Sequence, residues 1–157
     1  MPQNLSSLFI IFIIFCFGGC NKKDQAEPDR KALLTAHPWR IKALLYRMKD
    51  DVNNSNLTSY VYKDCELDDT YTFGTDSAFQ REDNAFTCAI LFYFGPYGEG
   101  NWMANSDFSQ LTISNPGYYS TVFTLDELTE DSFIIEQVTK DRFQDDIVYT
   151  YEFEPAQ

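Results

Sequence analysis

Short segments with a two-residue hydrophobic period run through most of this chain, and a period of two places alternate side chains on opposite faces of a β-strand. The last segment is the clearest: Ile147, Tyr149, Tyr151 and Phe153 alternate with Val148, Thr150, Glu152 and Glu154. Similar segments lie at 70–73, 111–114, 119–125 and 132–138. The connections between them leave no room for crossover helices. The pattern therefore predicts an all-β protein whose antiparallel strands either close as a barrel or fold as a sandwich.

The start of the domain predicts one short helix followed by the first strand. Asp29 is a candidate N-cap for a helix over 30–36, which ends before Pro38 because a residue that precedes proline avoids the α region. The period changes to two after Pro38. The residues expected on the buried face of this first strand are Trp39, Ile41, Ala43 and Leu45.

Local sequence patterns also predict the structure of two connections and of one apolar run. The stretch from Asp50 to Ser59 is expected to be a long polar loop, and Gly74–Ser77 is expected to be a hairpin turn between strands at 70–73 and 78–81. The run Ala89–Phe94 is continuously apolar, so it is expected to be buried on both faces.

The first nineteen residues have the features of an export signal. The run Leu8–Phe17 is apolar but shorter than the ~20 residues that span a bilayer, and small residues follow it. The sequence Phe17-Gly18-Gly19-Cys20 resembles a bacterial lipobox, which implies that Cys20 is the lipidated first residue of the mature protein. The predicted divisions are a signal at 1–19, a lipidated cysteine with a polar tether at 20–28, and a domain at 29–157. The alternative is a buried apolar helix or strand of a cytosolic protein.

The remaining cysteines fit an oxidising compartment. Removal of the signal and lipidation of Cys20 leave Cys65 and Cys88, which are predicted to form a disulfide. A zinc site is the rival, but one histidine, His37, and no Cys-x-x-Cys pattern do not supply the usual four ligands. No metal site is therefore expected.

Net charge excludes one class of partner. The chain has 24 acidic and 12 basic residues and a formal net charge of −12. Such an excess of acid repels nucleic acid, so no nucleic acid is expected as a partner. His37 has no Gly-x-Ser-x-Gly elbow beside it, and the glycines at 95–100 lack the Lys-Ser or Lys-Thr of a phosphate loop. We therefore expect neither an enzyme nor a cofactor.

Several motifs together resemble one family. They are the lipobox, the polar tether, a short helix before the first tryptophan, the segment Cys65–Phe73 with Cys88 downstream, Gly100-Asn101-Trp102 and the last strand. The sequence resembles the lipocalin-like lipoproteins of Bacteroidota over nearly the whole mature domain. The resemblance implies an up-and-down β-barrel of about eight strands with one short helix, anchored by lipid to the outer membrane and either periplasmic or surface-exposed.

Aromatic side chains are the candidate ligand contacts, because ligand cavities are mainly apolar and aromatic. The candidates are Trp102, Phe92, Phe94, Tyr97, Tyr118 and Tyr119. These residues could equally fill the interior as core. Two functions follow: a lipid-anchored barrel that binds a small apolar or amphipathic ligand, or an interaction protein with a filled barrel that docks to an envelope protein.

Overall fold

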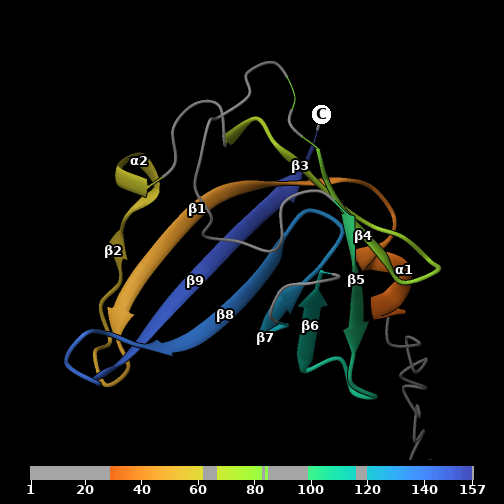
Figure 1. Ribbon diagram of the computed structural model, residues 1–157. Coiled ribbons are helices and arrows are strands. Elements are labelled where there is room, and N and C mark those ends of the chain that lie inside the picture. The colour runs from red at the N-terminus through yellow and green to blue at the C-terminus, as the bar shows by residue number, and fades with distance from the viewer. Residues whose placement is uncertain (1–28, 62–66, 83, 85–98, 116–119, 157) are drawn as a thin grey trace, which may run out of the picture.

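A closed antiparallel β-barrel forms the body of the molecule (Figure 1). The computed structural model describes residues 29–61, 67–82, 84, 99–115 and 120–156. Within these residues the sheet order is β2-β1-β3-β4-β5-β6-β7-β8-β9, and an additional pairing of β1 with β9 closes eight of the strands into a barrel. The strands are β1 (Trp39–Met48), β2 (Ser55–Asn56), β3 (Thr70–Phe73), β4 (Ala78–Glu82), β5 (Glu99–Ala104), β6 (Gln110–Ser114), β7 (Thr121–Leu128), β8 (Phe133–Lys140) and β9 (Asp146–Pro155). The barrel prediction is confirmed, and the sandwich alternative is wrong.

The predicted N-terminal helix is present as α1 (Arg30–Leu34). The Asp29 carboxylate accepts hydrogen bonds from the backbone N–H groups of Lys31 and Ala32, at 3.0 and 3.2 Å. These bonds satisfy two of the donors that the first turn of a helix leaves unpaired. Leu34 is fully buried, and its carbonyl accepts a 3.0 Å hydrogen bond from the indole of Trp39. This bond ties the helix to the first strand.

The two ends of the barrel differ because of the strand directions. Three short turns, at 74–77, 105–109 and 129–132, lie at the same end as α1. The Gly74–Ser77 turn joins β3 to β4 as predicted, with Phe73 opposite Phe79. At the other end, the chain passes from β4 to β5, from β6 to β7 and from β8 to β9. We call this second end the open end.

Aromatic rings fill the interior at the helix end. Phe133 is fully buried, and its ring centroid lies 5.5 Å from that of Trp39, 5.7 Å from that of Phe73 and 4.9 Å from that of Phe153. Such pairs add stabilisation beyond the area they remove from water. The barrel interior is therefore closed by an aromatic core at this end.

A β-bulge reverses which side chains face the interior in the second half of β1. The pairing of β1 with β9 shifts between Ile41 and Ala43, which makes Lys42 an extra residue. Beyond the bulge the parity is reversed, so Leu44 is fully buried and Leu45 is only half-buried. The prediction that Leu45 lies on the buried face is wrong, because simple alternation does not include an inserted residue.

The segment expected as a long polar loop contains two short elements. β2 pairs with β1 through Asn56 opposite Leu45, and α2 (Thr58–Val61) follows it. The Thr58 hydroxyl accepts a 2.9 Å hydrogen bond from the backbone N–H of Leu44. The loop prediction is wrong here because this order depends on pairing with the edge of β1.

Candidate functional site

Three strands continue past their neighbours at the open end. β3 pairs with β1 only at Trp39 opposite Tyr71, and the pairing of β7 with β8 ends at Thr124 opposite Glu136. In contrast, β1, β9 and β8 stay paired with one another as far as Met48 and Lys140. Figure 1 shows these three strands as a long arm toward the lower left. The inner face of the arm extends beyond the packed core.

Cross-strand register orders the inner side chains of this arm into four rows. From the helix end outward, each row takes one residue from β8, one from β9 and one from β1. The rows are Phe133, Phe153, Ile41; then Ile135, Tyr151, Leu44; then Gln137, Tyr149, Tyr46; and then Thr139, Ile147, Met48. The first two rows are buried, whereas all three residues of the third row are only half-buried. Accessible surface therefore begins at the third row, and in the fourth row Ile147 is buried again, at 5% exposed.

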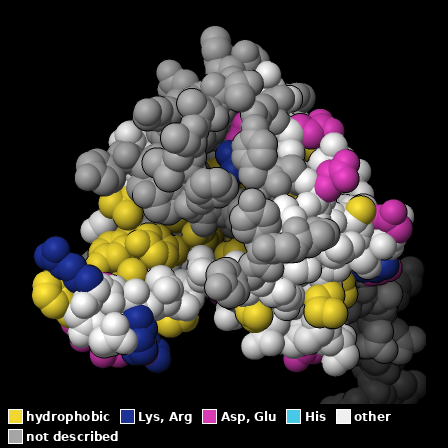
Figure 2. Space-filling model, in the orientation of Figure 1, with side chains coloured by type: hydrophobic (Ala, Val, Ile, Leu, Met, Phe, Trp, Pro, Cys, Tyr) yellow, Lys and Arg dark blue, Asp and Glu magenta, His cyan; other side chains and the backbone are white. Residues whose placement is uncertain are grey.

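We call Gln137, Tyr149, Tyr46 and Met48 the tyrosine shelf. The two tyrosine rings lie 5.7 Å apart between centroids and are tilted by 55°. The Tyr46 hydroxyl donates a hydrogen bond to the sulfur of Met48 at 3.4 Å, and the Tyr151 hydroxyl donates one to Gln137 Oε1 at 3.3 Å. Figure 2 shows a recess with a hydrophobic floor over β1 and β9. The shelf is therefore an accessible apolar surface with a few polar atoms at its edges.

A buried ion pair lies in the wall formed by β3 and β4. Arg81 Nε and Nη2 donate hydrogen bonds to Asp69 Oδ2 at 2.8 and 2.5 Å, and the two side chains are 5% and 1% exposed. The guanidinium carbon of Arg81 lies 5.7 Å from the centre of the Tyr71 ring. Because the two charges compensate each other, this pair adds no net charge to the interior.

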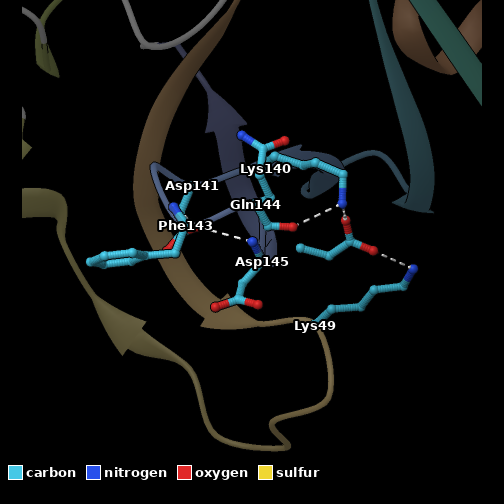
Figure 3. A network of polar contacts seen from close by, with 7 residues as sticks. Lys49, Lys140, Asp141, Phe143, Gln144 and Asp145 are labelled. Carbon is cyan, nitrogen blue, oxygen red and sulfur yellow. Dashed lines mark hydrogen bonds and ion pairs between the residues drawn. The ribbon is translucent and has the colours of Figure 1, made fainter.

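The turn between β8 and β9 is braced by polar contacts (Figure 3). The Asp141 carboxylate accepts hydrogen bonds from the backbone N–H groups of Phe143 and Asp145 at 2.7 and 3.0 Å. Asp146 bridges Lys140 and Lys49, at 2.6 and 2.8 Å. Lys49, Lys140 and Asp146 line a polar hollow of about 320 Å³ at the tip of the arm, which borders the shelf at Met48.

The bridge at the tip predicts a pH dependence. Hydrogen bonds from Lys140 and then Lys49 lower the pKa of Asp146 to about 2, from an ordinary value of 3.8. A lowered pKa means that the bridge stabilises the fold fully above pH 3.8 and is lost as the pH falls through about 2. Lys140→Met is expected to raise the Asp146 midpoint toward its ordinary value in a carboxyl-carbon NMR titration. Lys42→Met, at an exposed position of β1, is the control. An Asp146 midpoint that stays near 2 in Lys140→Met would contradict the role assigned to the bridge.

Of the aromatic residues that the sequence predicts as ligand contacts, one lies within the described residues. Trp102 is 4% exposed, its indole donates to the Gly74 carbonyl at 3.0 Å, and its ring centroid lies 6.0 Å from that of Phe73. These contacts place Trp102 in the core at the helix end, which matches the alternative of core filling. The other proposed contacts, namely Phe92, Phe94, Tyr97, Tyr118 and Tyr119, lie outside the described residues, as do Cys20, Cys65 and Cys88.

Sequence reasoning missed the shelf, although one of its residues left a signal. Strict alternation from Trp39 puts Tyr46 on the outer face, and only the bulge at Lys42 turns it inward. Gln137 did leave a signal, because it is a polar residue at a position where the alternation of Phe133 and Ile135 expects an apolar one. A polar residue on a core face is informative, since burying it requires a partner.

The sequence predicts no metal site in the described ranges, and His37 is the one histidine that it offers for chemistry. No group of three or more His, Cys, Asp and Glu side chains that could bind a metal occurs there. His37 lies 3.0 Å from the Pro38 carbonyl and 3.1 Å from the Glu130 carbonyl, and its ring packs 4.3 Å from that of Trp39. These contacts make His37 a link between β1 and the turn after β7. In the same described ranges, no helix is both long enough and apolar enough to cross a membrane.

Comparison with known proteins leaves the family open. No protein-family model matches the sequence, and no curated protein matches it. The resemblance to lipocalin-like lipoproteins therefore stays a prediction, and the fold itself is what the structure establishes.

Proposed function

We propose that this protein is a lipid-anchored envelope protein, without enzymatic activity, whose barrel binds a small apolar or amphipathic ligand on the tyrosine shelf. One observation carries the proposal: the third interior row is half-buried where the first two rows are closed. Apolar and aromatic surface with a few convergent polar groups is typical of small-molecule sites. The packed row of Ile135, Tyr151 and Leu44 would form the floor of the site.

The anchoring part of the proposal is supported by the N-terminal sequence. The small residues before Cys20 fit lipidation there, and the polar stretch at 20–28 is long enough to separate a lipid from the domain. A barrel tethered in this way would hold its ligand at the surface of the outer membrane.

A second candidate function is docking to another envelope protein. It is favoured by the tip of the arm, where Phe143 is 68% exposed and the guanidinium carbon of Arg142 lies 4.6 Å from the centre of the Phe143 ring. Exposed aromatic and arginine side chains are enriched at protein interfaces. In this alternative the shelf would bind no ligand.

Native mass spectrometry of the lipidated protein tests the two candidates. A ligand on the shelf is expected to appear as an added mass that leaves on denaturation. Tyr149→Ala is expected to reduce its occupancy about tenfold, because the central ring of the shelf is removed. Phe143→Ala is the matched control, since that ring is exposed at the tip and off the shelf.

The outcomes separate the candidates. An apo mass in every preparation would overturn ligand binding and leave the docking function. Equal loss of the added mass in Tyr149→Ala and Phe143→Ala would place the ligand somewhere other than the shelf.

A further inference from the structure

One hydrogen-bond donor on the shelf has no acceptor among the described residues. The carbonyl oxygen of the Gln137 amide accepts from the Tyr151 hydroxyl at 3.3 Å, and this leaves the amide NH₂ group to donate. A half-buried amide donor gains most when a ligand supplies an oxygen, because water is partly excluded there. Gln137 is thus a polar anchor at one edge of an apolar surface.

At the opposite edge of the shelf, a second hydrogen-bond donor is bonded only to a weak acceptor. The Tyr46 hydroxyl donates to the Met48 sulfur at 3.4 Å, and a thioether is a weak acceptor. Gln137, Tyr149 and Tyr46 lie on three adjacent strands. Because adjacent strands are ~4.8 Å apart, the row is on the order of 10 Å wide. Tyr149 therefore separates the two donors in the row.

None of the four side chains of the shelf is charged. Arg81 is paired with Asp69 in the wall. Arg47 and Glu136, which belong to β1 and β8, pair with each other at 3.3 Å on the outer face of the arm. The nearest lysines, Lys49 and Lys140, line the hollow beside Met48 and are paired with Asp146. The whole chain has a net charge of −12, so an anionic ligand would be repelled, and the shelf itself holds no cation to offset the cost of removing such a ligand from water.

From these contacts we infer that the ligand is a neutral, flat, apolar molecule with a carbonyl oxygen, which accepts a hydrogen bond from the Gln137 side-chain amide. The tilted tyrosine rings and the polarisable Met48 sulfur suit the face or edge of a conjugated ring system. This assignment rests on the proposed ligand-binding function and adds to it a chemical class and a specificity-determining residue.

The test uses the full chain in phosphatidylcholine nanodiscs and photolabelling with benzophenone, which is a neutral aromatic ketone. Peptide mapping locates the label. Competition by 9-fluorenone, by fluorene and by fluorene-2-carboxylate then compares a ketone, a hydrocarbon and an anion on nearly the same ring system. Empty nanodiscs correct for partitioning of each compound into lipid.

We expect the label on β1, β8 or β9, and we expect fluorenone to displace it at a concentration about five- to tenfold lower than fluorene does. Gln137→Leu is expected to abolish this difference by weakening fluorenone alone. Gln137→Glu, which replaces the donor with an acceptor, is expected to reverse it. Gln110→Leu is the matched control, because Gln110 is an exposed glutamine on β6.

Different results would overturn different statements. Labelling of the shelf with equal displacement by fluorenone and fluorene, or a difference that persists in Gln137→Leu, would overturn the carbonyl assignment and leave the proposed function standing. Strongest displacement by the carboxylate would overturn the neutral class. Labelling away from the shelf, or labelling that none of the compounds displaces, would overturn the proposed function and this inference together.

Discussion

Arg81→Met is expected to destabilise the barrel by about 3–5 kcal/mol, which is a large part of the stability of a domain this size. The substitution leaves the Asp69 carboxylate, whose side chain is 1% exposed, without the guanidinium that neutralises it. Burial of an uncompensated charge costs more than loss of the pair itself. The free energy of unfolding from urea denaturation, monitored by circular dichroism, measures the effect.

Two comparisons make the Arg81 result specific. Arg40→Met removes a pair with Glu154 whose side chains are 38% and 36% exposed, and it is expected to cost no more than about 1 kcal/mol. The double variant Arg81→Met with Asp69→Leu is expected to recover much of the lost stability, because both charges of the pair are removed together. Equal losses in Arg81→Met and Arg40→Met would show that burial of the pair has no special cost.

Phe133→Ala is expected to cost about 3–5 kcal/mol, through lost burial and the cavity left behind. Phe133 is fully buried, and its ring lies against those of Trp39, Phe73 and Phe153. The matched control is Phe143→Ala, which removes the same ring from an exposed turn and is expected to change stability by no more than about 0.5 kcal/mol.

The melting temperatures and unfolding free energies of the two phenylalanine variants check this second prediction. A small loss of unfolding free energy in Phe133→Ala would mean that the helix end is not packed as a closed core. In that case the division of the interior into a core and an accessible shelf would fail as well.

Local patterns predicted the elements that depend on neighbouring residues. Alternation located β9 and its inner face, and the Gly74–Ser77 turn fixed the hairpin between β3 and β4. The Asp29 cap predicted the start of α1. These features depend on side-chain period, turn chemistry and capping, all of which act within a few residues.

The sequence by itself determined that this chain forms short antiparallel strands and an all-β fold, and tertiary structure decided which residues share the interior. The bulge at Lys42 reverses the parity of β1 and brings Tyr46 beside Tyr149. Arg81 and Asp69 become one buried pair only when β3 and β4 lie together. The physical reason is that period sets the two faces of a strand, whereas register against a partner distant in sequence sets which side chains meet.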